Sequence, residues 1–291
     1  MALTLEYGPE RSATSVPRVS AGRWHRPLLL LIAAELVLLF APTTLWLVGR
    51  WTISVWHNAH GMFVPLVSAW LARQELKRRP DLPKASSAWG FAFLVPALVL
   101  HAIDAGLHTQ LLSAAALLLA VPGLALLLIG APRTWAIAFP IAFLLFALPI
   151  PLAFTEPVHL LLRTMIAGLT ADVLPLLGVD VYLEDTTLHM TTGVVSVGDA
   201  CSGFSTLYAA ITFAALLAYM ATSWRRRLLV LGAAVPVAIA ANLLRVIALA
   251  LMVAWGHAWL LDTFVHPLSG MLTFALALPV LLWLSEEKDP R

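Results

Sequence analysis

The sequence predicts an all-α, polytopic membrane protein with about eight transmembrane helices. Hydrophobic residues make up 60% of its 291 residues and charged residues only 12%, whereas soluble domains contain roughly half and a quarter. The mean hydropathy is +0.88, and the apolar residues gather in runs close to the length of about 20 that a bilayer-spanning helix needs. A net charge of +2 gives no indication of nucleic-acid binding.

Eight apolar runs are candidates for these spans. They are residues 27–48, 57–73, 88–104, 109–129, 134–153, 204–222, 228–252 and 268–285. Together they predict a single integral membrane domain over residues 27–285. We expect a cytoplasmic amino-terminal segment, 1–26, before this domain and a cytoplasmic tail, 286–291, after it.

The basic residues predict which way the chain faces. Clusters of Arg and Lys precede residue 27, lie between 73 and 84, and recur at Arg133 and at 225–227. With eight spans every cluster falls on the cytoplasmic side of the cytoplasmic (inner) membrane, as the positive-inside rule requires. The same count places both termini in the cytoplasm and residues 154–203 outside.

Residues 157–178 decide whether this count holds. The segment is apolar, yet it carries His159, Arg163 and Asp172, which is typical of an amphipathic or shallow re-entrant helix on the outer surface. Counting it as a ninth span would move the 225–227 cluster outside. Whether it crosses the membrane stays open at this point.

The segment that follows predicts a short extracytoplasmic β-hairpin. Val181-Tyr182-Leu183 and Val194-Val195-Ser196-Val197 are typical of strands. The Thr-rich residues between them and Gly193 are interpreted as turn material. This hairpin leads directly to Cys201.

Three reactive side chains are expected at one depth on the outer face. Cys201 is the only cysteine and opens the span that begins at 204. Arg245 lies 18 residues beyond Arg227, about 27 Å along a helix, so it returns to the outer third of its span. His266 closes the next outer loop.

The three residue types predict thiol acyl transfer. A histidine can take the thiol proton or protonate a leaving amine, and an arginine can stabilise a thiolate or an oxyanion. An arginine within a membrane helix costs about 2.5–3.5 kcal/mol on insertion scales, so we expect it to have a polar partner or a role. Asn242 shares its helix face. His60 and Asp199 are further candidates for support.

No metal or other cofactor is expected. The sequence lacks closely spaced metal-ligand motifs such as His-Glu-x-x-His and lacks a glycine-rich phosphate loop. For His60 an ordinary structural role at the membrane interface is an equal alternative, and Asp199 could be a solvated loop residue.

Several segments resemble the exosortase and archaeosortase family, from about residue 50 to residue 285. They are Asn58-Ala59-His60-Gly61, Val64-Pro65-Leu66, Phe139-Pro140, Leu148-Pro149-Ile150-Pro151, Asp199-Ala200-Cys201-Ser202-Gly203, Ala241-Asn242-Leu243-Leu244-Arg245-Val246, and His266 with Gly270. The short core form of the family is expected.

The resemblance implies a membrane cysteine peptidase and transpeptidase that acts on exported proteins. It implies carboxy-terminal sorting signals as substrates, each with a Pro-Glu-Pro-like motif, a transmembrane helix and a basic tail, cleaved at the outer face through a thioacyl intermediate. Cys201 would be the nucleophile, His266 the proton carrier and Arg245 the stabiliser of the thiolate or transition state.

Two other classes of function remain as alternatives. One is a transporter or lipid flippase in which Arg245 and His266 bind an anionic group. The other is a non-catalytic factor in envelope polysaccharide export. Transporters place polar residues near the midplane and often carry repeated halves, whereas here these residues gather toward one face. The enzyme is therefore favoured, with exported proteins and membrane lipid as its expected partners.

Overall fold

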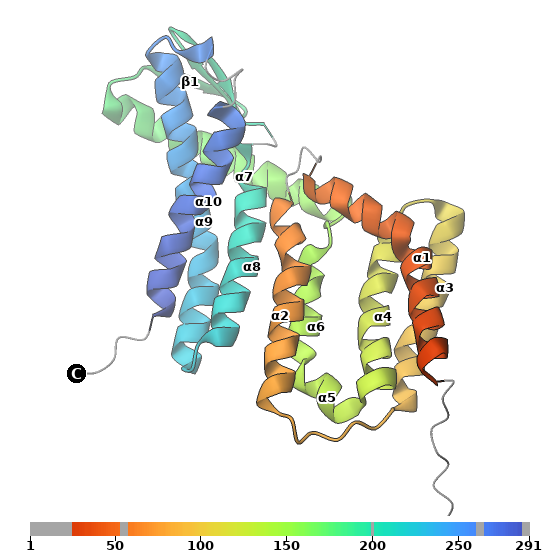
Figure 1. The fold of residues 1–291 in the computed structure, drawn as a ribbon. Coiled ribbons are helices and arrows are strands. Elements are labelled where there is room, and N and C mark those ends of the chain that lie inside the picture. Colours follow the sequence, from red (N-terminus) through yellow and green to blue (C-terminus); the bar gives the residue numbers. More distant parts are fainter. Residues whose placement is uncertain (1–24, 53–57, 199–200, 260–264, 287–291) are drawn as a thin grey trace, which may run out of the picture. The chain divides into compact units, whose positions relative to one another are not determined.

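Figure 1 shows a computed structural model of the chain, which describes residues 25–52, 58–198, 201–259 and 265–286. The contacts divide the chain into two units, Met1–Ala41 and Pro42–Arg291. Helix α1 (His25–Thr52) supplies the described part of the first unit and continues into the second. All further elements belong to the second unit. The predicted domain bounds 1–26, 27–285 and 286–291 stay a prediction.

Helices α2 to α4 form the first part of the second unit. The 3-10 turn η1 (Ala59–Met62) leads into α2 (Phe63–Arg78), and η2 (Ala88–Gly90) leads into α3 (Phe91–Leu107), which packs on α4 (Leu111–Ile129). A Cβ added to Gly90 would lie 2.5 Å from the Gly123 carbonyl oxygen. Small residues therefore let these helices approach closely, as they do in membrane helix pairs.

The predicted span 134–153 is not one helix. It consists of α5 (Ala131–Ala136), α6 (Ala138–Phe143) and the 3-10 turn η3 (Leu144–Ala147). The helical segment ends at Ala147 because Pro149 and Pro151 lack a donor and disfavour helical conformations in the residues before them. The chain then enters α7 (Leu152–Val173), which η4 (Leu174–Leu177) extends.

The predicted hairpin is a three-stranded antiparallel sheet in the order β1 (Val181–Glu184), β2 (Thr187–Met190), β3 (Gly193–Ser196). The interpretation as turn material holds for Thr186, Thr191 and Thr192, which lie in the two turns of the sheet, but it was wrong for Thr187–Met190, which forms β2, and for Gly193, which begins β3. Leu188 and Met190 alternate with polar residues and are buried, which is the period-2 pattern of a half-buried strand. The buried face packs on α7 and α9 around Ile166, Val246 and Val253.

Helices α8 (Phe204–Met220), α9 (Trp224–Ala254) and α10 (Val265–Ser285) lie side by side (Figure 1). Alanines dominate their contacts, with Ala210 and Ala214 of α8 facing Ala234 and Ala238 of α9. This arrangement brings the beginning of α8 close to the later turns of α9 and the first turns of α10.

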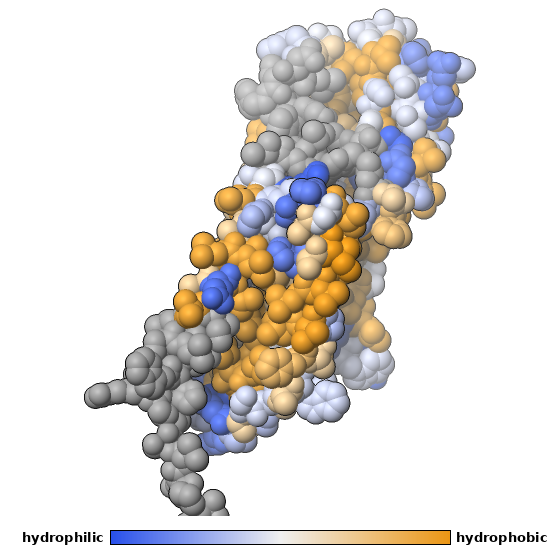
Figure 2. All heavy atoms as spheres, turned by 90° about the vertical axis from the view of Figure 1, so that its right-hand side faces the viewer, coloured by the Kyte–Doolittle hydropathy of each residue, from blue (hydrophilic) through white to orange (hydrophobic). Residues whose placement is uncertain are grey.

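Five helical segments of the described chain are long and apolar enough to cross a membrane. They are Ala88–Leu107, Leu111–Ile129, Ala153–Leu177, Trp224–Ala254 and Leu268–Ser285. On α3 the side chains of Phe91, Val95, Val99 and Ile103 form an exposed apolar stripe, and Figure 2 shows large hydrophobic areas on the face it displays. Such a surface is typical of helices that face lipid.

The number of eight spans stays a prediction. The segment Ala153–Leu177 corresponds to the predicted surface helix 157–178 but begins earlier, and by length and composition it could cross a membrane. The predicted placement on the outer surface is therefore neither supported nor contradicted.

Candidate active site

Cys201 lies in a short loop between the sheet and α8, which we call the Cys201 loop (residues 201–203). The Cys201 amide donates to the Gly198 carbonyl at 2.9 Å. Gly203 ends the loop with φ +82°, and a Cβ there would lie 2.5 Å from the Asn242 side chain. Both the backbone conformation and the space therefore require glycine.

Asn242 fixes this loop from α9. Its Nδ2 donates to the Cys201 carbonyl oxygen at 3.0 Å, and the side chain is only 1% exposed. The main-chain position of Cys201 is thus held by a buried side chain from another helix. Asn242, which the sequence predicted as a supporting residue, is in direct contact with Cys201.

Arg245 lies one helical turn after Asn242 and reaches α10. Its Nε donates to Ser269 Oγ at 2.8 Å. A Cβ added to Gly270 would lie 3.8 Å from the guanidinium Cζ and Nη1 atoms, so the guanidinium packs against the first turns of α10. The structure therefore brings Arg245 together with the helix that carries His266.

The Cys201 thiol is buried and close enough to Arg245 to feel its charge. The side chain is 8% exposed. Burial raises the pKa of the Cys201 thiol above its ordinary value, while the positive charge of Arg245 acts in the opposite direction. At neutral pH the group is therefore mainly a thiol, and nucleophilic attack would require a base that removes its proton.

Two predicted site residues are described in part or not at all. His266 belongs to the first turn of α10, four residues before Gly270, and its side chain lies outside what the structure describes. Asp199 lies outside the described residues.

His60 belongs to an aromatic cluster that extends to the Cys201 loop. Its ring contacts Tyr208 edge to face at 4.7 Å, and Tyr208 in turn lies 6.3 Å from Phe204, the first residue of α8. The Tyr208 hydroxyl donates to the Leu148 carbonyl at 3.1 Å. His60 is thus linked to the beginning of α8 through two ring contacts.

His159 is a residue of this region that the sequence did not include in the site. Its Nδ1 lies 2.9 Å from Ser202 Oγ, and its ring lies 4.5 Å from that of Phe204. The sequence predicted only that it belongs, with Arg163 and Asp172, to an amphipathic or shallow re-entrant helix. Asp172 is exposed, whereas His159 is 2% exposed, and the sequence did not predict its contact with Ser202.

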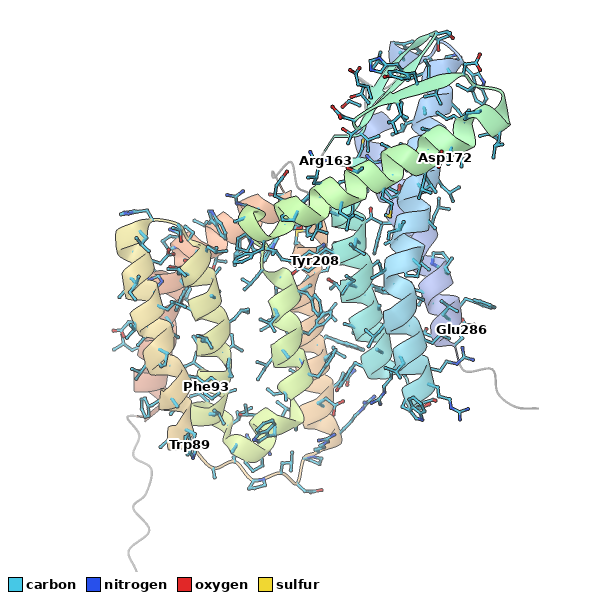
Figure 3. The ribbon with its side chains drawn as sticks, turned by 180° about the vertical axis from the view of Figure 1, so that it is seen from behind. Trp89, Phe93, Arg163, Asp172, Tyr208 and Glu286 are labelled. Atoms are coloured by element: carbon cyan, nitrogen blue, oxygen red, sulfur yellow. The ribbon has the colours of Figure 1, made fainter. Side chains whose placement is uncertain are left out.

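Figure 3 shows why α7 can supply this histidine. The helix, on which Arg163 and Asp172 are labelled, passes close to the beginning of α8, whose Tyr208 is also labelled. Arg163 pairs with Glu156 of the same helix at 3.1 Å. Thr155, Leu162 and Ile166 are buried on the same face as His159 at helical spacing, but the sequence alone does not show whether that face meets water or protein.

In the described part of the chain, no three His, Cys, Asp or Glu side chains come together as a metal site would require. The polar groups around Cys201 are instead an amide, a hydroxyl, an imidazole and a guanidinium. These groups can donate hydrogen bonds and move protons.

Fold and site together define a helical membrane protein that holds a buried thiol beside an arginine. A model of the transmembrane exosortase family matches residues 51–283. The chain belongs to this family, and the resemblance found in the sequence is confirmed. No curated protein and no solved structure matches the chain. Membership shows a multi-pass membrane protein of the transpeptidase type, a family whose substrates are in general exported proteins with sorting signals.

Proposed function

We propose that this protein is a cysteine peptidase and transpeptidase of the cytoplasmic membrane. It cleaves carboxy-terminal sorting signals of exported proteins at the outer face, with Cys201 as nucleophile, Arg245 as stabiliser of the negative charge and His266 as proton carrier. The observation that supports this most directly is the buried Cys201 thiol under the positive charge of Arg245, inside the segment that matches the family.

The first half of the reaction forms a thioester. His266 removes the Cys201 proton, and the sulfur attacks the carbonyl carbon of the scissile peptide bond. The oxygen gains negative charge, which Arg245 stabilises by hydrogen bonds. The C–N bond then breaks, and the leaving amine takes the proton back from His266. The amino-terminal part of the substrate is now bound to Cys201.

The second half releases the substrate. An amine, a hydroxyl group or a water molecule gives a proton to His266 and attacks the thioester carbonyl. The C–S bond breaks, and the Cys201 sulfur takes the proton from His266 and becomes a thiol again. Transfer results with an amine or a hydroxyl group, and hydrolysis with water.

Two further observations support these roles. The thiol needs a base because burial raises its pKa, and position 266 is one helical turn from Gly270, against which the Arg245 guanidinium packs. The hydrogen bond from Nε to Ser269 fixes the orientation of the guanidinium. An oxyanion stabiliser must be oriented before the reaction begins.

The outer location rests on the distribution of charge along α8 and α9. Cys201 precedes α8, whereas Arg225–Arg227 lie at the opposite end of this helix pair, where α9 begins. The positive-inside rule places these arginines in the cytoplasm. A membrane-impermeant maleimide should therefore label Cys201 in intact cells. Labelling in inverted vesicles, whose cytoplasmic face is exposed to the reagent, but not in intact cells would contradict the proposed location.

Processing of a substrate by Cys201 variants tests the function. The protein is co-expressed with an exported reporter that ends in a Pro-Glu-Pro-like motif, an apolar helix and a basic tail. Wild type should remove the signal, and Cys201→Ala and Cys201→Ser should leave it intact at equal membrane abundance, because a serine hydroxyl loses its proton far less readily than a thiol and is a far weaker nucleophile in the same site. Processing by Cys201→Ala near the wild-type rate would exclude covalent catalysis by this residue.

A further inference from the structure

The Cys201 loop is held by two buried hydrogen bonds from two different helices. Asn242 of α9 donates to the Cys201 carbonyl oxygen at 3.0 Å. His159 of α7 holds the next residue, because its Nδ1 lies 2.9 Å from Ser202 Oγ. The Ser202 oxygen also accepts a hydrogen bond from the Phe204 amide at 3.3 Å. The loop is thus fixed on both sides of the peptide bond that follows the thiol-bearing residue.

Because His159 and Ser202 are buried, each depends on the other for its hydrogen bond. The two residues are 2% and 1% exposed, so water cannot replace either partner. An unpaired polar group in such a place costs more free energy than a paired one gains. The imidazole ring also packs on Phe204, which limits its rotation and keeps Nδ1 directed toward Ser202.

We propose that His159 is a positioning residue which, through Ser202, holds the Cys201 thiol in place beside Arg245. This inference rests on the proposed function, since it assigns a role in the reaction of Cys201. The histidine acts through its Nδ1 hydrogen bond and transfers no proton. Loss of that bond frees the loop on the α7 side, and a small displacement of a reacting atom is enough to slow a reaction strongly.

The shape of the side chain offers a way to separate positioning from proton transfer. An asparagine at position 159 places an amide group near the position of Nδ1, whereas a glutamine places it nearer to Nε2. Neither amide can act as a base at neutral pH. A hydrogen bond through Nδ1 is therefore kept by His159→Asn and lost by His159→Leu, while any proton transfer is lost in both.

The experiment compares these variants in two assays. Processing of the reporter gives kcat and KM, and the rate of alkylation by N-ethylmaleimide in membranes without substrate reports how well the thiol is held. The set is His159→Asn, His159→Gln, His159→Leu, Ser202→Ala and the double variant His159→Leu with Ser202→Ala. Thr170→Val is the matched control, because Thr170 is a buried residue of α7 whose Oγ1 has no hydrogen-bond partner in the described structure.

We expect His159→Leu and Ser202→Ala to lower kcat about tenfold or more with KM nearly unchanged. Alkylation should become faster by a few-fold, since the loosened thiol is less protected. The double variant should be no worse than Ser202→Ala, because that single variant already removes the hydrogen bond to His159 together with the one from the Phe204 amide. His159→Asn and Thr170→Val should remain close to wild type, and His159→Gln should resemble His159→Leu.

Other results would overturn the inference. His159→Asn as inactive as His159→Leu would assign proton transfer to this residue, and wild-type kcat and alkylation in both His159→Leu and Ser202→Ala would leave it no role. If His159→Leu does not accumulate in the membrane, Ser202→Ala and His159→Asn still show whether the hydrogen bond between these two residues positions the thiol. Failure of the proposed function is recognised separately, by processing in Cys201→Ala, while the alkylation assay continues to report on the loop.

Discussion

Two polar clusters in this protein differ in the groups that surround a buried charged side chain. At the end of α2 the carboxylate of Glu75, 7% exposed, accepts from the Tyr219 hydroxyl at 2.9 Å and pairs with Arg78 at 3.3 Å and Arg79 at 3.6 Å. Around Cys201 the charge of Arg245 faces a thiol and a serine hydroxyl. The first cluster pairs permanent charges, and the second pairs a permanent charge with a group that can lose a proton.

The two clusters therefore suit different tasks. The Glu75 cluster joins α2 to α8, and Tyr219 also stacks on Phe139 of α6 at 3.8 Å. In the proposed reaction the positive charge of Arg245 near the Cys201 thiol stabilises the negative charge that forms when the thiol ionises or an oxyanion develops.

The largest effect that would test this contrast is expected at Arg245. A lysine keeps the charge but loses the planar set of donors, so Arg245→Lys should lower kcat about 100-fold or more, the range seen for oxyanion-hole donors. Steady-state processing at matched membrane abundance measures it. A lysine variant within a few-fold of wild type would mean that Arg245 contributes only its charge.

The next effect is expected at Gly203. An alanine there would clash with Asn242 and would have to adopt φ +82°, so Gly203→Ala should displace the loop and lower kcat about tenfold or more. Gly168 is a matched control on α7, since a Cβ there meets no atom within 4 Å. Equal kcat for Gly203→Ala and Gly168→Ala would show that the Asn242 contact does not position Cys201.

A smaller effect is expected in the pH dependence of thiol alkylation. Because burial raises the pKa of the Cys201 thiol, its N-ethylmaleimide rate should still rise with pH above the range where an exposed cysteine has reached its plateau. The positive charge of Arg245 lowers this pKa, so Arg245→Gln should react more slowly than wild type at each pH below the plateau. Identical pH profiles for the two proteins would contradict the electrostatic interaction between Arg245 and Cys201.

The smallest effect on catalysis is expected in the Glu75 cluster. Tyr219→Phe removes one hydrogen bond to a carboxylate and should lower the free energy of unfolding by about 1.5–3 kcal/mol, the usual value of a bond to a charged group. The kcat for reporter processing should be unchanged. A thermal-shift assay in detergent follows the loss of stability as a lower melting temperature. A loss of kcat without a change in melting temperature would show that the Glu75 cluster affects the Cys201 site.

The sequence predicted much of this arrangement because helix geometry is regular. The rise per residue places Arg245 near the end of α9 that meets Cys201, and one turn separates it from Asn242. The contact of Arg245 with Ser269 could not be predicted, because it depends on how α9 and α10 pack. The buried position of His159 could not be predicted for a similar reason, since a histidine in an apolar segment has the same pattern whether its helix face meets water or protein.

The strands show a different source of error. Thr187, Leu188, His189 and Met190 alternate between partly buried and buried positions, yet the threonines of the segment favoured the interpretation as a turn. The breaks at Ala147 and Leu152 were equally visible as prolines at 149 and 151. The apolar length of the segment predicts one continuous span, whereas these prolines indicate a break in the helix.

The most direct test of the central claim is to look for the thioester itself. Wild-type protein is incubated in membranes with the sorting-signal reporter and quenched in acid, and its Cys201 peptide is analysed by mass spectrometry. We predict that this peptide carries the carboxy-terminal residues of the cleaved reporter, that neutral hydroxylamine releases them, and that Arg245→Lys accumulates far less adduct. Processing of the reporter without any hydroxylamine-sensitive adduct on Cys201, at time points within a single turnover, would contradict the account.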